Sequence, residues 1–171
     1  MAQQNQHNEE FFDVATAPQA SQDVASWHKD PTYRRPFKVV RWRVVDEEWQ
    51  GRSAIDAVVV VDVNGQEDIE AAQGVGGVQA LDSALRRVLL HHFPFIEGVK
   101  LIELYTHRGG QGTAAEVMSI MKFSYNQQQW STMRKSRDLL ASAWLALIDG
   151  YEWVISKELD KKDSAGSGVL S

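Results

Sequence analysis

The chain is internally repeated: residues 38–94 align with residues 100–156 at a constant offset of 62 positions. Corresponding positions keep their character, apolar on apolar and turn on turn, at Val61 and Phe123, Asn64 and Asn126, Leu81 and Ala143, and Leu85 and Leu147. Both the period-two spacing of strands and the 3.6-residue spacing of helices stay in register between the two halves. We therefore predict one duplicated domain whose halves pack about a pseudo-twofold axis, with binding sites between them.

Each half is predicted to contain three strands followed by a helix. The strand segments alternate apolar and polar residues or are rich in β-branched residues, and they cover residues 37–46, 53–63, 66–73, 99–107, 115–125 and 128–133. Asn64 and Gly65 form a strong hairpin signal, because both accept positive φ. The helices follow at about 78–92 and 136–156, with Ser136 as a predicted N-cap. This order predicts the α+β class, with antiparallel strands and two helices on one face of the sheet.

The other sheet face has no predicted cover. Val58 and Val60 point opposite to Val59 and Val61 along one strand, so this strand is apolar on both faces. A single helix layer covers only one of these faces, and exposed apolar patches usually mark interfaces. We therefore expect a homodimer formed through the uncovered face.

The duplicated domain is predicted to span residues 37–156, as repeats 37–94 and 99–156. Residues 1–36 are rich in Gln, Asn and Ser, so we expect a flexible polar leader there. Residues 157–171 are charged and then Gly- and Ser-rich, so we expect a flexible tail. Three aromatic side chains leave open whether the leader docks on the core or on a partner: Phe11, Phe12 and Trp27.

Composition excludes several classes of protein. The 171 residues include no cysteine, so disulfides and thiolate metal sites are impossible. The net charge of -5, with scattered Lys and Arg, argues against a nucleic-acid partner or binding to an anionic membrane. No uninterrupted apolar run reaches the roughly 18 residues that span a bilayer, and the first residues lack the pattern of a secretory signal. We expect a cytoplasmic protein that folds around its own core.

The Gly-rich turn at residues 74–78 is the candidate binding site that spacing favours. A helix follows it, so free backbone amides and the positive end of the helix dipole suit a carboxylate there. The alternative is that the glycines only make a tight turn from strand to helix. His91 and His92 diverge on a helix, and His107 lies near a Gly-rich loop. We therefore predict no catalytic residue, no metal site and no cofactor.

Three motifs resemble those of a known family and occur in the same order. Residues 74–81, Gly-Val-Gly-Gly-Val-Gln-Ala-Leu, resemble Gly-x-Gly-Pro-Val-Asp/Asn-Ala-Leu, and residues 112–115 resemble Gly-Thr-Ala-Ala. Residues 130–132 resemble Trp-Ser/Gly-Thr, and residues 141–149 resemble Ala-Ser-Trp-x-Ala-Leu-x-Asp with one extra alanine, Ala143. The resemblance, from about residue 37 to 154, is to the C-terminal regulatory (allosteric) domain of α-isopropylmalate synthase and citramalate synthase.

This resemblance implies two βββα units, a homodimer, and feedback binding of leucine or isoleucine in branched-chain amino acid biosynthesis. It places the ligand at two groups of residues: Gly74, Val75, Gly76, Gly77, Val78 and Leu81 around the start of the first helix, and Met133, Arg134, Lys135 and Ser136 before the second. The synthases also carry a catalytic barrel, which has no counterpart here. We therefore expect a stand-alone regulatory domain that is not an enzyme, senses a branched-chain amino acid or related small carboxylate, and acts on a separate catalytic synthase subunit.

Two departures from the family pattern leave a second hypothesis open. The family's Pro is Gly77 here, and residues 133–136 replace a stretch of small residues, Val-Gly-Val-Ser. The long cations Arg134 and Lys135 either fill the effector pocket or adapt it to a more acidic ligand. If the ligand site is lost, the chain is a protein–protein interaction module that has kept the fold.

Overall fold

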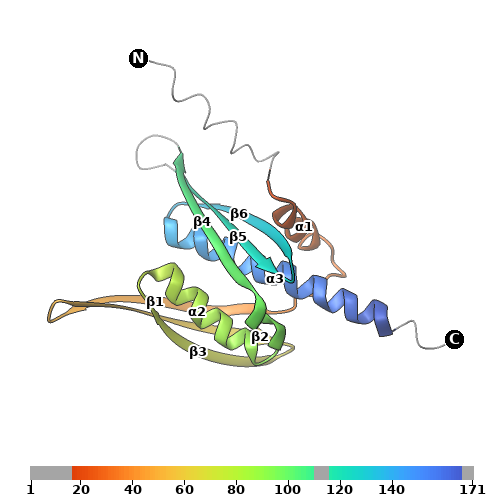
Figure 1. The fold of residues 1–171 in the computed structure, drawn as a ribbon, viewed down its shortest axis with the longest axis horizontal. Helices are drawn as coiled ribbons and strands as arrows, with labels where there is room; N and C mark the ends of the chain where they lie inside the picture. Colours follow the sequence, from red (N-terminus) through yellow and green to blue (C-terminus); the bar gives the residue numbers. More distant parts are fainter. Residues whose placement is uncertain (1–16, 110–115, 167–171) are drawn as a thin grey trace, which may run out of the picture.

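The computed structural model describes residues 17–109 and 116–166. Its elements, in chain order, are α1 (Gln19–Trp27), β1 (Lys38–Trp49), β2 (Arg52–Val63), β3 (Gln66–Gly74), α2 (Gly77–Leu90), the 3₁₀ helix η3 (Pro94–Gly98), β4 (Lys100–Gly109), β5 (Glu116–Tyr125), β6 (Gln128–Ser136) and α3 (Leu139–Gly166). The predicted α+β class with repeated βββα units is confirmed. The strands form two antiparallel sheets, β1-β2-β3 and β4-β5-β6, where the sequence analysis placed all six in one, and the two units lie one above the other in Figure 1.

The duplication extends to irregularities of the backbone. In β1 the register shifts between Val39 and Arg41, and in β4 it shifts at the equivalent place, between Leu101 and Glu103. Both hairpins turn through residues with positive φ: Asn64 and Gly65 in the first unit, Asn126 and Gln127 in the second. The two units therefore share the same bulge as well as the same strand order, as descent from one duplicated unit predicts.

Each long helix packs on its own sheet, and α2 and α3 also contact each other. The inward side chains of β2 and β5 and the apolar stripes of the two helices form one buried cluster that includes Val59, Val61, Leu81, Leu85, Met121, Phe123, Leu147 and Tyr151. A hydrogen bond of 2.6 Å from the Tyr151 hydroxyl on α3 to Asp82 Oδ1 on α2 joins the two units. The units thus share a core and behave as one domain.

The segment before β1 differs from the expected leader. Helix α1 packs on β6 and α3, with Ala20 and Val24 buried. The Ser21 hydroxyl accepts a hydrogen bond from Met133 N at 2.6 Å and lies 3.4 Å from Met133 O. Ser21 therefore satisfies backbone groups on the outer edge of β6, which would otherwise be open to another strand. The Trp27 ring lies 5.4 Å from the Tyr33 ring in a tilted arrangement, and Lys157 Nζ of α3 lies 5.4 Å from the Trp27 ring centroid, whereas Phe11 and Phe12 lie outside the described residues.

Helix α3 begins and ends later than predicted. Ser136 is the last residue of β6, so the N-cap prediction is wrong; Asp138 takes this role, with its Oδ1 accepting from Ala141 N at 2.8 Å. The helix continues to Gly166, through part of the expected tail. Among the described helices, α3 alone is long and apolar enough to cross a bilayer, although it contains no uninterrupted apolar run of that length. However, 67% of its most apolar 18-residue window is buried inside the protein. We interpret α3 as the core helix of a globular domain.

The second sheet faces are not the open apolar surface that the sequence analysis expects. Val60 and Met118 alternate with the core-facing side chains and lie outside the core cluster, yet both are buried, with exposed fractions of 6% and 5%. Apart from Tyr105, the exposed large apolar side chains of β1 and β4 instead lie at equivalent positions of the two units: Val40 (43%) and Ile102 (43%), and Trp42 (38%) and Leu104 (40%). We call these four residues the edge-strand patch. Trp42 also contacts Trp144 of α3, with ring centroids 5.7 Å apart. The other exposed large apolar side chains among the described residues are Ile69, Val75, Tyr105, Leu139, Leu145 and Leu159.

Candidate functional site

The start of α2 is a tight turn with unsatisfied amides. Gly76 is the N-cap residue, in extended conformation, and no side chain caps the helix. The Gln79 side chain bends back, and its Oε1 accepts from Val75 N at 2.8 Å. A Cβ on Gly74 would lie 2.6 Å from Ala80 N, so the close approach of strand and helix requires glycine there. The glycines therefore do make a tight turn, and that turn leaves the amides of the first helical turn without a protein acceptor among the described side chains.

The start of α3 shows what fills the equivalent position in the other unit. By the 62-residue offset, Asp138 corresponds to Gly76. The Asp138 carboxylate accepts a hydrogen bond from Ala141 N, and so supplies the negative charge that a helix N-terminus favours. No acidic residue lies in the first turn of α2. One unit thus carries its own carboxylate at the helix start, and the other presents the same geometry without one.

The pseudo-twofold arrangement brings the two helix starts together. A Cβ on Gly77 would lie 3.1 Å from Leu140 Cδ1 and 3.5 Å from Val44 Cγ1. Leu140 is the equivalent of Val78, the residue that follows Gly77, so the two helix starts meet one position away from exact equivalence. Apolar side chains thus lie beside the uncapped amides of α2, which is the combination of groups that holds a small apolar carboxylate.

The residues predicted from the first helix have different surroundings from one another. Gly76, Gly77 and Val78 form the N-cap and first turn of α2, and Val75 is 94% exposed beside them. Leu81 is completely buried in the core cluster. The open part of this candidate site is therefore the turn and the first residues of α2.

The second predicted group lies along the end of β6, where alternation separates its members. Arg134 pairs in register with the buried Ser119, whereas Lys135 pairs with Met118 on the opposite face. The Arg134 guanidinium donates from Nε and Nη2 to the two carboxylate oxygens of Asp149, at 2.5 and 2.9 Å, and Asp149 is buried. This hydrogen bonding raises the pKa of Arg134. The two cations thus do not act together on one cleft: Arg134 is held against α3, and Lys135 is exposed on the other face.

Met133 and Ser136, the other members of this group, have structural positions. The backbone of Met133 bonds to Ser21 of α1, and Ser136 pairs with Val117 at the end of the sheet. The local sequence pattern does not distinguish these structural positions from a ligand-binding loop, because their contacts are with residues more than 15 positions away.

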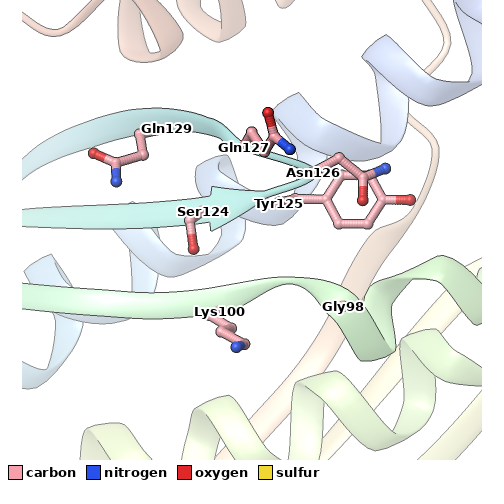
Figure 2. A pocket seen from close by; sticks show the side chains of 7 residues that line it. All are labelled: Gly98, Lys100, Ser124, Tyr125, Asn126, Gln127 and Gln129. Carbon is pink, nitrogen blue, oxygen red and sulfur yellow. The ribbon is translucent and has the colours of Figure 1, made fainter.

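The hairpin between β5 and β6 borders a polar cavity that the sequence analysis did not identify. This cavity, of about 330 Å³, is lined by Gly98, Lys100, Ser124, Tyr125, Asn126, Gln127 and Gln129 (Figure 2). Figure 2 shows side chains of β4, β5 and the turn around it, with amide and hydroxyl groups and one ammonium. It offers Tyr125 as its only large apolar wall among the described residues, and so suits an apolar effector less well than the α2 start.

His91 and His92 contact carboxylates of the first sheet. His92 Nε2 lies 2.6 Å from Asp68 Oδ2, and His91 Nε2 lies 3.3 Å from Glu70 Oε1, so both fasten the end of α2 to β3. Within residues 17–109 and 116–166, no group of three or more His, Asp and Glu side chains converges as metal ligands would.

Comparison with known proteins agrees with this architecture. Residues 19–155 match the LeuA allosteric (dimerisation) domain family. The chain is 33% identical over 131 residues to an (R)-citramalate synthase of Geobacter sulfurreducens, which covers 74% of this chain and 25% of that enzyme. It is 33% identical over 128 residues to the enzyme of the same name from Sulfolobus acidocaldarius, with coverage of 74% and 23%, and 37% identical over 100 residues to that of Synechocystis sp., with coverage of 57% and 18%.

The chain therefore spans a quarter or less of the length of these relatives. The family match begins at Gln19, which places α1 inside the family domain, in agreement with its packing on β6 and α3. Since the match covers most of the chain and the fold contains the repeated βββα units, this chain belongs to the LeuA allosteric (dimerisation) domain family.

Proposed function

We propose that this chain is a regulatory domain that binds a small apolar carboxylate, of the branched-chain amino acid class, at the start of α2. The observation that carries the proposal is the difference between the two units. Asp138 caps the Ala141 amide at the start of α3, and Gly76, which has no side chain, leaves the equivalent amide of Gln79 in α2 uncapped. A ligand carboxylate would take the place that Asp138 takes in the other unit.

The surroundings of the turn support an apolar ligand. Val44 and Leu140 lie within van der Waals reach of Gly77, and Val78 is half-buried beside them. An aliphatic side chain placed against these groups is removed from water, which contributes roughly 0.8 kcal/mol per buried methylene. The amides and the apolar contacts together favour leucine, isoleucine or valine over a dicarboxylate, whose second charge would face apolar side chains.

The wider proposal is a homodimeric, cytoplasmic regulatory subunit without chemistry of its own. It rests on the match of residues 19–155 to the allosteric domain family and on the similarity to citramalate synthases. We propose that it acts on a separate catalytic synthase subunit. The edge-strand patch of Val40, Trp42, Ile102 and Leu104 is the surface for self-association.

Thermal unfolding with a panel of metabolites tests the ligand proposal. A ligand at 100 times its dissociation constant stabilises the folded state by about 2.7 kcal/mol, which raises Tm by several degrees. We expect leucine, isoleucine or valine to do this for the unaltered protein. Gly76→Asp is the matched variant, because it copies Asp138 and its new side chain has open space. It should abolish the response.

Two results would contradict the proposal. An equal response in Gly76→Asp would place the ligand elsewhere, and no response to any branched-chain amino acid would favour the second hypothesis, an interaction module without a ligand. The exposed edge-strand patch is the observation that favours this second function.

A further inference from the structure

A second cavity, of about 390 Å³, lies between α3, the end of β6 and the segment that leads into β1. We call it the leader groove. Its walls are His28, Arg35 and residues 37–39 on one side, Arg134 of β6, and Leu145, Ile148, Asp149 and Glu152 of α3. It is separate from the α2 turn, because none of residues 74–81 lines it.

Both carboxylates in the leader groove already have partners. Asp149 receives two hydrogen bonds from Arg134. Glu152 is almost completely buried, and its Oε1 lies 2.7 Å from His28 Nε2 and accepts from the Tyr33 hydroxyl at 3.2 Å. Tyr33 is itself held by Ser156, at 2.7 Å between the hydroxyl oxygens. An incoming ammonium group would therefore find no unpaired carboxylate here.

The unmatched charge in the groove is positive. Arg35 and Lys38 line it, both are exposed, and neither makes a hydrogen bond or ion pair with a described residue. Opposite them lie apolar side chains, with Leu145 40% exposed on α3 and Ile148 half-buried beside it. Phe37 and Val39 continue this apolar wall at the start of β1. A cavity of this size with an apolar wall and a few convergent polar groups has the properties of a small-molecule site.

We propose that the leader groove is a second ligand site, for a small apolar monocarboxylate that lacks an ammonium group. Its carboxylate pairs with Arg35 and Lys38, and its aliphatic body packs on Leu145 and Ile148. The site differs from the one proposed at α2 in its place and in its ligand, which carries a carboxylate but no ammonium group.

The position of the groove also gives ligand binding a structural consequence. One wall is the leader segment, which reaches the core through contacts such as the 3.0 Å hydrogen bond from Trp153 Nε1 to Asp23 Oδ2. A ligand that bridges Arg35 to α3 adds a further link between this segment and the core. Occupancy should therefore slow the local opening of residues 19–33.

Calorimetric titration with three probes tests the proposal. The probes share one carbon skeleton: 4-methylpentanoate, its neutral amide, and leucine. The protein carries Gly76→Asp, so that the site proposed at α2 is closed and a failure there does not affect the result. We expect 4-methylpentanoate to bind, and the amide and leucine to bind about tenfold more weakly or not at all.

The paired variant Arg35→Gln/Lys38→Gln should weaken binding of 4-methylpentanoate by about tenfold or more. Both side chains are exposed, so the fold should tolerate their loss. Its control is Arg41→Gln/Lys100→Gln, which removes two cations outside the groove, Lys100 being the equivalent of Lys38 in the other unit. This control should bind as before.

Amide hydrogen exchange supplies the second readout. Saturating 4-methylpentanoate should slow exchange of residues 19–33 several-fold, and should not do so in Arg35→Gln/Lys38→Gln. The proposal is overturned if no probe binds, if the amide binds as tightly as the carboxylate, if leucine binds best, or if the loss is equal in the control variant.

Discussion

At the scale of single residues, the ion pair of Arg134 and Asp149 explains a departure from the family pattern. Arg134 stands where the family has a small residue, and its bidentate bond ties β6 to the buried Asp149 of α3. Replacing it with a small residue would not simply reopen a pocket, because Asp149 would remain buried without a partner. The arginine and the aspartate must therefore be considered as a pair.

Arg134→Met should destabilise the protein more than Asp149→Asn does. We expect a loss of about 1–3 kcal/mol for Arg134→Met, because Asp149 is left charged and buried, whereas Arg134 is one-third exposed and can reach water when Asp149 is neutral. Urea unfolding of both variants and of the double variant measures the coupling between the two side chains. Equal losses in the two single variants would show that the buried charge is not what the arginine compensates.

Asp82 predicts a dependence of stability on pH. Burial raises the pKa of this carboxyl group above 3.8, although the bond from Tyr151 and the charge of Arg86 oppose the shift. The folded state therefore holds the proton more tightly than the unfolded state, and this contribution to stability is complete below the unfolded pKa and lost as pH rises through the folded pKa.

Asp82→Asn removes that loss and keeps an acceptor for the Tyr151 hydroxyl. We expect the variant to be more stable than the unaltered protein near about pH 7, with the difference shrinking towards about pH 4. Urea midpoints at the two pH values measure it. A variant that is less stable at both would mean that the ionised carboxylate is favourable in its site.

At the scale of elements, the two units fill the equivalent contact between helix and sheet with side chains of different size. Gly150 of α3 faces Phe123 of β5, and a Cβ on Gly150 would overlap the phenylalanine ring. The equivalent pair in the first unit is Val88 and Val61, both buried. Duplication thus conserved the packing of helix on sheet while exchanging one large and one small residue for two of intermediate size.

Gly150→Val should cost at least about 1–3 kcal/mol by overpacking against Phe123. The double variant Phe123→Val/Gly150→Val recreates the pair of the first unit and should recover part of that loss, although it also removes the stacking of Phe123 on Trp130. Thermal unfolding of the single and double variants measures the recovery. Additive losses would show that helix α3 does not sit over β5 as closely as the first unit predicts.

The elements of the duplicated core could be predicted from sequence, because hairpins and amphipathic helices are local. The pattern around Asn64 and its repeat at Asn126 placed both hairpins correctly. Helix α1 was missed because its two buried apolar side chains, Ala20 and Val24, are few in a polar segment. Its contacts are long-range, so no spacing within the segment reveals them.

For the candidate site, the sequence predicted the turn at the start of α2 but not the long-range contacts around it. The Gly-rich turn predicts a helix start without a side-chain cap, and the structure has that geometry. The separation of Arg134 from Lys135 follows from strand β6 reaching Ser136, three residues beyond the predicted end. The leader groove was missed because it joins residues 28–39 to α3, more than 100 positions away.

At the scale of the whole molecule, the exposed apolar residues of β1 and β4 predict self-association. A homodimer should form through a surface that contains the edge-strand patch, because exposed apolar side chains mark interfaces. An obligate interface of this kind buries roughly 2,000 Å² or more. Val40→Lys/Ile102→Lys places charges at two exposed positions and should give a folded monomer. Sedimentation at micromolar concentration measures the mass of both proteins. A monomeric unaltered protein would contradict the prediction.

The central claim is that a carboxylate ligand binds the uncapped start of α2, and amide NMR during a titration with isoleucine tests it most directly. The two units supply an internal comparison, because the equivalent amides of α3 are already capped by Asp138. We predict progressive, saturable shifts at residues 76–79, and clearly smaller shifts at residues 138–141, where only the Leu140 side chain meets the ligand. Shifts that leave residues 76–79 untouched, or that appear equally at both helix starts, would contradict the account.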